Sequence, residues 1–121
     1  MTLNVIAREA AEVHESPYGS VGVLHEGPDL NAWWIWKDRE EIEPDWSTLT
    51  REDFLYVVQG SLRLEFRDDP GGTLTIEAGE SFVIPAGLAF RGYRWPRDSD
   101  DPCLFVAVSP ADAVMAKAPV S

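Results

Sequence analysis

Cysteine and histidine are almost missing from this sequence of 121 residues. The single cysteine, Cys103, has no partner within the chain, so an internal disulfide is excluded and a reducing compartment is favoured. Cys103 lies in the apolar run CLFVAV, which is typical of a packed core. The only imidazoles belong to His14 and His25, and a lone histidine on a strand is more often a surface or core residue than a metal ligand. None of these residues by itself marks a catalytic or metal centre.

Basic residues and long apolar runs are also scarce. Ten lysines and arginines stand against 21 aspartates and glutamates, which gives a formal net charge of −11. This charge argues against a nucleic-acid partner or an anionic membrane surface. No apolar run approaches the roughly 20 residues that a membrane helix needs, and the N-terminus lacks the basic start and apolar core of a secretion signal. We therefore expect a cytoplasmic protein with no nucleic-acid or membrane partner.

Short runs rich in branched and aromatic residues make up most of the chain, and turn residues separate them. They are SVGVLH (20–25), NAWWIWK (31–37), DFLYVVQ (53–59), SLRLEF (61–66), TLTIEA (73–78), SFVIP (81–85), AFRGYRW (89–95) and CLFVAVS (103–109). Because they follow one another closely, without helical patterns between them, they predict antiparallel all-β packing rather than βαβ units. The turn residues DDPGG (68–72) predict a hairpin. The simplest organisation is one domain over residues 1–121.

One helix is predicted near the C-terminal end, over SPADAVMAKA (109–118). Ser109 suits the N-cap and Pro110 suits the first helical position. Asp112 would stand in the first turn, where a negative charge interacts favourably with the helix dipole. We expect this short helix to cover a sheet edge or one end of a barrel.

Two segments resemble the paired signature motifs of the cupin superfamily. Residues 53–60 have the first motif's spacing of an acidic residue, six others and a glycine, with Asp53 in place of the usual glutamate. GESFVIPAGLAF (79–90) has the second motif's first glycine and its Pro-x-Gly turn, but Phe90 stands where that motif has histidine. The resemblance covers residues 20–110. It implies an antiparallel double-sheet jelly-roll barrel of a kind that commonly forms homodimers.

The sequence departs from the cupin pattern where the resemblance implies a metal. Cupin metals are held by three histidines and one carboxylate, and imidazole suits iron, manganese, nickel and zinc in softness and geometry. The first motif's His-x-His pair is replaced in either possible frame, by Trp46 and Thr48 or by Ser47 and Leu49. Of the four ligands only the carboxylate remains, as Asp53. We therefore expect the usual metal site to be absent and no cofactor to be bound.

Strand parity extends this reasoning to a charged pair. If Phe90 points into the barrel, Gly92 and Arg94 also point inward, and Asp53 points inward from the facing motif. An unpaired charge inside a barrel is costly, so we expect Arg94 to pair with Asp53 in place of a metal–carboxylate contact. The pair has two interpretations. It is either a structural lock, or a catalytic pair in which Asp53 is a general acid or base and Arg94 grips an oxyanion.

Aromatic residues supply the candidate ligand contacts. AWWIWK places Trp33 on one face of its strand and Trp34 and Trp36 on the other. Packing in a core or a dimer explains large aromatic side chains on both faces, and so does an aromatic ligand pocket. Trp46 is expected near the barrel mouth, and Phe90 is expected to fill the space of a metal ligand. These five residues are the predicted ligand contacts.

Three functions are consistent with these features. The first is a metal-independent protein that binds a small anionic or carbonyl-bearing organic ligand and catalyses isomerisation, cyclisation or elimination through Asp53 and Arg94. The second is a noncatalytic small-molecule sensor or binding module. The third is a metal-dependent dioxygenase or isomerase with unusual ligands, which requires His14 or His25 to reach the cavity. Family membership alone does not separate them, because cupins span enzymes, storage proteins and regulators.

Overall fold

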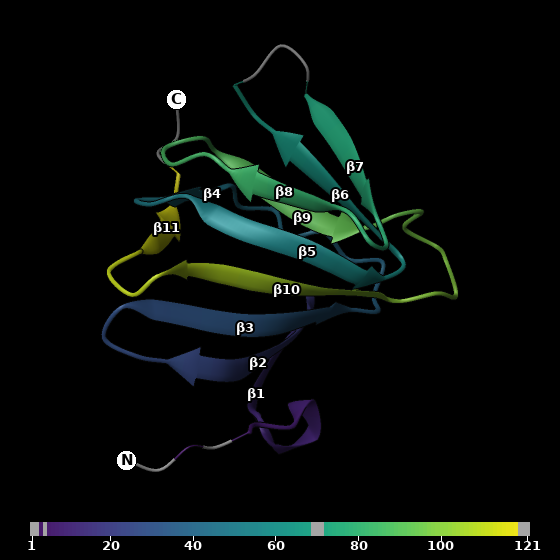
Figure 1. Ribbon diagram of the computed structural model, residues 1–121. Helices are drawn as coiled ribbons and strands as arrows, with labels where there is room; N and C mark the ends of the chain where they lie inside the picture. Colours follow the sequence, from purple (N-terminus) through teal and green to yellow (C-terminus); the bar gives the residue numbers. More distant parts are fainter. Residues whose placement is uncertain (1–2, 4, 69–71, 119–121) are drawn as a thin grey trace.

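The computed structural model describes residues 3, 5–68 and 72–118, which form two antiparallel β-sheets and one short 3₁₀ turn (Figure 1). The elements are η1 (Arg8–Ala10), β1 (Glu12–Ser16), β2 (Gly19–Glu26), β3 (Leu30–Lys37), β4 (Ser47–Leu49), β5 (Asp53–Gln59), β6 (Ser61–Phe66), β7 (Thr73–Glu77), β8 (Ser81–Ile84), β9 (Phe90–Arg94), β10 (Cys103–Pro110) and β11 (Met115–Lys117). The predicted all-β antiparallel architecture is confirmed. Within the described part of the chain, no helix is long and apolar enough to cross a membrane.

The larger sheet contains six strands in the order β1-β2-β3-β10-β5-β8. Its central strand β10 pairs with β3 along its whole length, from Cys103 opposite Lys37 to Pro110 opposite Leu30. The other edge of β10 pairs with β5, and the register shifts between Leu104 and Phe105. Because side chains alternate between the two faces of a strand, these registers fix which residues of β3, β10 and β5 face the second sheet.

The smaller sheet contains five strands in the order β11-β4-β9-β6-β7. In β6 the alternation expected from SLRLEF is present, since Leu62, Leu64 and Phe66 are buried. The register between β6 and β9 places Phe66 opposite Phe90. Phe90 therefore shares the inward face with the leucines of β6, as strand parity predicts.

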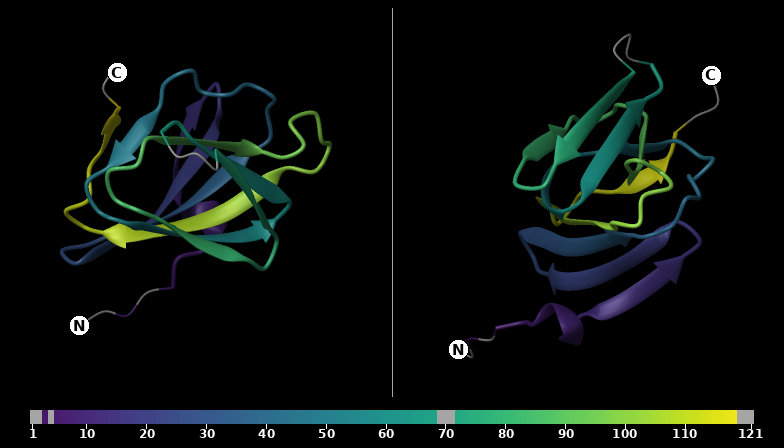
Figure 2. Two further views of the ribbon diagram at one scale, coloured as in Figure 1. Left: turned by 90° about the horizontal axis from the view of Figure 1, so that it is seen from above. Right: turned by 90° about the vertical axis from the view of Figure 1, so that its right-hand side faces the viewer.

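The hydrophobic core lies between the two sheets. Figure 2 shows that the β1–β3 hairpins lie at one edge of the molecule, away from β6 and β7. The buried apolar cluster draws on both sheets and consists of Leu49, Leu55, Val57, Leu62, Leu64, Phe66, Ile76, Ile84, Phe90, Cys103, Phe105 and Ala107. Contacts between strands remote in sequence hold it together, so the core forms only when the sheets meet.

The strand runs identified from the sequence correspond to β2, β3 and β5–β10, and β1, β4 and β11 are additional. The DDPGG hairpin falls partly on residues 69–71, which lie outside the described residues. The strands that flank this turn, β6 and β7, pair in antiparallel orientation, with Glu65 opposite Thr73. Phe66 donates its backbone N–H to the carbonyl of Gly72 at 2.7 Å, so the chain reverses direction at the expected place.

The predicted C-terminal helix is wrong. Ser109 and Pro110 continue β10 against Asn31 and Leu30, a turn follows, and residues 115–117 form the strand β11. The local helix signals lose because neighbouring strands satisfy this backbone. Residue 118 donates its N–H to the carbonyl of Trp46 at 2.8 Å, and β11 pairs with β4. Pairing with a sheet edge overrides intrinsic helix propensity here.

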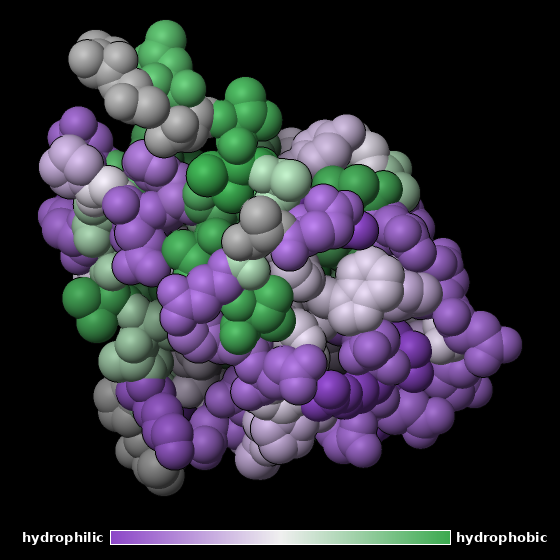
Figure 3. All heavy atoms as spheres, turned by 90° about the horizontal axis from the view of Figure 1, so that it is seen from below, coloured by the Kyte–Doolittle hydropathy of each residue, from purple (hydrophilic) through white to green (hydrophobic). Residues whose placement is uncertain are grey.

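Strand β1 is the outer edge of the larger sheet, and all five of its residues are exposed. Seen from the β1 side, hydrophilic residues cover much of the surface, and hydrophobic residues gather mainly on the left half of the view (Figure 3). Glu12 and Glu15 lie on this edge. Charged side chains on an edge strand disfavour the addition of another strand there.

Candidate functional site

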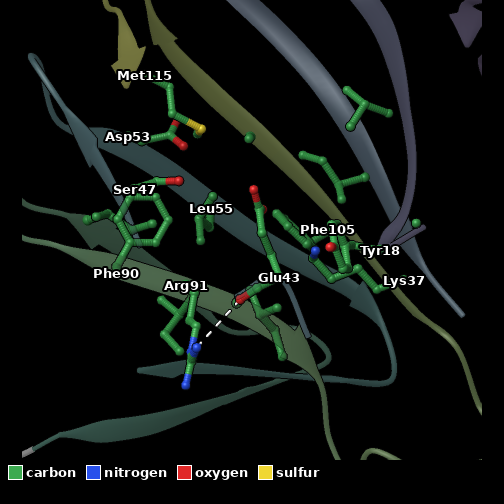
Figure 4. Close-up of a pocket in the computed structure, with 18 of the residues that line it drawn as sticks. Tyr18, Lys37, Glu43, Ser47, Asp53, Leu55, Phe90, Arg91, Phe105 and Met115 are labelled. Atoms are coloured by element: carbon green, nitrogen blue, oxygen red, sulfur yellow. Dashed lines mark hydrogen bonds between the residues drawn. The ribbon is translucent and has the colours of Figure 1, made fainter. Parts of the chain in front are cut away.

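A cavity of about 230 Å³ lies between the two sheets. Both sheets contribute apolar side chains to its wall, namely Val21, Ile35, Leu55, Leu62, Leu64, Ile84, Phe90, Phe105 and Ala107. Polar side chains are fewer and occupy particular places: Figure 4 shows Asp53 and Ser47 in one part of the pocket and Lys37 and Tyr18 in another. An apolar cavity with a few convergent polar groups is the usual form of a small-molecule site.

Asp53 is the buried carboxyl group of this cavity. It begins β5 opposite Ile84, and 7% of its surface is exposed. Its Oδ1 atom is buried and has no hydrogen-bond partner among the described residues. Burial raises the pKa of Asp53 from its ordinary value of 3.8 to about 6, because the charged form loses its hydration. The predicted inward orientation of Asp53 is confirmed.

Three further positions correspond to the replaced histidines of the cupin motifs. Ser47 pairs with Phe90 across β4 and β9, and both line the cavity. Leu49 is buried in the core beside them. The replaced His-x-His pair could be aligned with the sequence in two ways. The structure favours the alignment in which Ser47 and Leu49 occupy the two histidine positions. Phe90 fills apolar space in the cavity wall, as predicted.

These residues do not fit a transition metal of the kind that the cupin resemblance implies. At the four corresponding positions the side chains are a hydroxyl, an isobutyl group, a carboxylate and a phenyl ring, so the hydroxyl oxygen and the two carboxylate oxygens are the only donors and no imidazole is present. Iron, manganese, nickel and zinc sites in cupins depend on imidazole ligands. Among the residues that the structure describes, no group of three or more His, Cys, Asp or Glu side chains is arranged to hold a metal ion.

The two histidines lie away from the cavity. His14 is in the exposed edge strand β1, with its Nε2 atom 3.6 Å from a carboxylate oxygen of Glu12. His25 is exposed near the end of β2, where its ring packs beside Gly27. The metal-dependent interpretation required one of them to reach the cavity, and neither does so in this arrangement.

The second polar group of the cavity is Lys37, at the end of β3. Its side chain is half-buried and lines the cavity together with Tyr18 and Glu43 (Figure 4). Burial lowers the pKa of Lys37, and the interactions with Cys103 and Glu43 only partly oppose this effect. The β1–β2 turn approaches this end of β3 closely, because Gly19 (φ +136°) has no side chain: a Cβ atom there would lie 2.4 Å from the carbonyl oxygen of Trp36.

The predicted ion pair between Asp53 and Arg94 is wrong. Arg94 does face inward and is buried, because β9 places it opposite Leu62. However, its Nε atom donates a hydrogen bond of 2.9 Å to the carbonyl oxygen of Arg97. The turn after β9 thus supplies the partner that the sequence reasoning assigned to Asp53. Backbone acceptors in a neighbouring turn cannot be identified from strand parity, which explains the error.

The predicted aromatic contacts are divided among different surroundings. Phe90 lines the cavity, whereas Trp33 is partly buried against the hydrophobic core. Trp34 and Trp36 lie on the outer face of β3 in a shallow groove with Arg8. Trp46 stacks against the guanidinium group of Arg91, which lies 4.3 Å from the ring centroid. The structure therefore brings only Phe90 to the cavity beside Asp53 among these five residues.

Sequence reasoning missed Lys37, Tyr18 and Met115 as cavity residues. Lys37 had a usable signal, because it follows Trp33 and Ile35 at the same parity in β3. Met115 had none, since it depends on the pairing of β11 with β4. Two contacts hold this segment in place: Arg51 pairs with the carboxylate of Asp112 at 2.8 Å, and the N–H of residue 114 donates to the hydroxyl of residue 50.

Comparisons with known proteins agree with this architecture. The family model described as a cupin domain matches residues 39–109, which is more than half of the chain. Oxalate decarboxylase from Bacillus subtilis at pH 4.6 superposes with a TM-score of 0.73 at 14% identity, covering 91% of this chain and 30% of that chain. The formate complex of the Lactobacillus farciminis oxalate decarboxylase gives 0.70 at 17% identity, covering 90% and 34% respectively.

These solved structures establish the fold, and the chain spans about a third of their length. Another structure of the Bacillus subtilis enzyme, with a TM-score of 0.70 at 15% identity over 88% of this chain and 30% of that one, concerns Mn(II) centres of that protein. No curated protein gave a significant match. The two-sheet jelly roll, the paired motifs and the matching family model lead to one conclusion: the chain belongs to the cupin domain family.

Proposed function

We propose that this cupin domain binds a small carbonyl-bearing or anionic organic molecule between its sheets, without a metal, and that Asp53 transfers a proton to or from it. One observation carries the proposal: a buried carboxyl group faces the cavity and its Oδ1 atom has no partner among the described residues. Leaving a buried polar atom unpaired costs free energy, so a group of this kind often has a ligand as its partner.

The chemistry follows from the protonation state of Asp53. A carboxyl group with a pKa of about 6 exists in both forms near neutral pH, which is the condition for an efficient general acid or base. The apolar wall strengthens its interaction with any charge that develops on the ligand. Removal of a proton next to a carbonyl group, followed by its return elsewhere or by loss of a leaving group, gives isomerisation, cyclisation or elimination.

The test combines a binding measurement with proton exchange. Thermal unfolding with pyruvate, 2-oxoglutarate, dihydroxyacetone and lactate identifies compounds that stabilise the folded chain. NMR in D₂O then measures exchange of the hydrogens next to the carbonyl group. We expect Asp53→Asn to retain binding but to slow exchange by at least about 100-fold, the usual contribution of a general base. Glu52→Gln removes a neighbouring exposed carboxylate and is the matched control.

Two outcomes would contradict the proposal. Exchange that proceeds equally fast in Asp53→Asn would exclude Asp53 as the base. Failure of all four compounds to stabilise the protein would contradict the proposed ligand class. In either case the remaining part of the proposal is tested separately, because binding and exchange are measured independently.

A noncatalytic binding module is the second candidate, and the position of Arg94 favours it. The guanidinium group that was predicted to stabilise an oxyanion is instead hydrogen-bonded to the Arg97 carbonyl. Arg94 is therefore not available to stabilise developing negative charge, and this contribution to catalysis is lost from the site. Binding without proton exchange in the wild-type protein would identify this function.

We also propose that the chain acts as a single cupin domain and assembles as a homodimer. Support comes from the outer face of β5 and β8, where Phe54, Tyr56, Val58 and Val83 are each 42–49% exposed. Phe54 and Val83 are cross-strand neighbours, so the apolar side chains are contiguous. Exposed apolar patches of this kind are typical of protein–protein contacts. A second copy of the chain is the proposed occupant.

A further inference from the structure

The amino group of Lys37 has no assigned role in the proton chemistry proposed for Asp53. Lys37 lines the same cavity from the end of β3, and among the described residues it makes no hydrogen bond or ion pair. Tyr18, Glu43 and Phe105 line the cavity around it (Figure 4), and Cys103 is its cross-strand neighbour on β10. An amine in such a half-buried, largely apolar place is poorly hydrated.

We infer that Lys37 is a nucleophile that forms a reversible imine with the carbonyl group of a small aldehyde, ketone or 2-oxo acid bound in the cavity. This inference rests on the proposed function, because it assumes that the cavity admits such a compound.

The step is balanced without any redox partner. The lone pair of the neutral amine attacks the carbonyl carbon, so a C–N bond forms and the oxygen takes a proton to give a carbinolamine. The carbinolamine oxygen then receives a second proton and leaves as water, so the C–O bond breaks while the nitrogen lone pair forms the C=N bond. The nitrogen loses its two protons in the course of these steps, and they balance the two protons that the oxygen gains. The carboxyl group of Glu43, whose charge acts on Lys37, is the carrier that we assign to these protons.

The environment favours the neutral amine that this reaction needs. Burial lowers the pKa of Lys37, and an amine activated by desolvation is the recognised form of a Schiff-base lysine. The other lysine of the sequence, Lys117, has the opposite surroundings. Lys117 is exposed on β11, and a hydrogen bond with Asp45 raises its pKa. The chain therefore contains its own matched control.

Reductive trapping tests the inference directly. Wild-type protein, Lys37→Arg and Lys117→Arg are incubated with pyruvate or glyoxylate and sodium cyanoborohydride at neutral pH. Reduction of an imine adds the mass of the probe less one oxygen atom, and peptide mapping locates the adduct. We expect labelling of Lys37 to be at least about tenfold faster than labelling of Lys117, to persist in Lys117→Arg and to disappear from that position in Lys37→Arg.

The outcomes separate this inference from the proposed function. Thermal stabilisation by pyruvate without any adduct at Lys37 would show that the cavity binds carbonyl compounds but forms no imine. Absence of both stabilisation and adduct with pyruvate and with glyoxylate would overturn the imine inference, whereas the proposed function falls only if 2-oxoglutarate, dihydroxyacetone and lactate also fail to stabilise the protein. An adduct confined to Lys117 or to the N-terminal amine would also overturn the inference. Mapping of the wild-type adduct needs no variant, so a poorly folding Lys37→Arg protein would not prevent a decision.

Discussion

Replacing Asp53 with asparagine should stabilise this protein, and the gain should depend on pH. The rise of the Asp53 pKa from 3.8 to about 6 corresponds to about 3 kcal/mol, since one pKa unit is worth about 1.36 kcal/mol. The folded chain holds this proton more tightly than the unfolded chain does. Stability therefore falls as the pH rises from about 4 to about 6 and stays at its lower value above that range.

Asparagine carries no charge at any of these pH values, so Asp53→Asn escapes the cost of burying a carboxylate. Linkage then predicts a stabilisation of about 3 kcal/mol at pH 8 and about 1 kcal/mol at pH 4.5. Urea unfolding followed by tryptophan fluorescence at the two pH values measures both differences. Glu52→Gln removes the same charge from an exposed neighbouring position and controls for the net charge of the chain.

Two results would refute this reasoning. If Asp53→Asn destabilised the protein equally at both pH values, the carboxyl group would have to be hydrogen-bonded in its charged form rather than desolvated. If Glu52→Gln reproduced the pH-dependent gain, relief of overall negative charge would be the cause. A stabilising substitution at a site that abolishes proton exchange would indicate that the protein sacrifices stability for function at Asp53.

Three other predictions concern the fold, the lost metal site and assembly. Gly19→Ala should lower the free energy of unfolding by about 2 kcal/mol or more in urea titrations, because it combines a positive φ with a backbone clash; unchanged stability would contradict the close approach of this turn. Replacing Ser47, Leu49 and Phe90 together by histidine should create a site that binds manganese or zinc at close to one equivalent, as measured by elemental analysis. The tag-free wild-type protein should contain less than about a tenth of an equivalent of metal. Metal near one equivalent in the wild type would show that other ligands were overlooked. Tyr56→Lys should shift a dimer toward monomer in light scattering at unchanged far-UV circular dichroism, and an unaltered mass would remove the β5 face from the interface.

Much of the architecture could be predicted from the sequence because it depends on local patterns. Apolar and polar residues alternate along β6, and glycines mark the turns between strands. Because successive side chains of a strand point to opposite faces, this alternation identifies the residues that face inward. The same parity placed Asp53 and Phe90 on facing strands of one cavity, and the structure places both there. The family motifs supported this placement because their spacing fixes two strand starts relative to their turns.

The partners of these residues could not be predicted in the same way. Arg94 has the predicted direction but a backbone carbonyl of Arg97 satisfies it, which leaves the Oδ1 atom of Asp53 unpaired among the described residues. The C-terminal segment carries sound helix signals, yet an open edge of β4 captures it as a strand. In both cases the outcome depends on which hydrogen-bonding group lies nearest in space.

Residue identity and spacing along single strands were enough to predict the β-strands, the cupin motifs, the loss of imidazole ligands and the inward direction of Asp53. Three features came only from the packing of the two sheets: Ser47 and Leu49 occupy the replaced histidine positions, Arg94 bonds to the Arg97 carbonyl rather than to Asp53, and Met115 reaches the cavity from β11. These features depend on the register and separation of strands far apart in the chain. Such quantities are set when two sheets pack, and no local pattern encodes them.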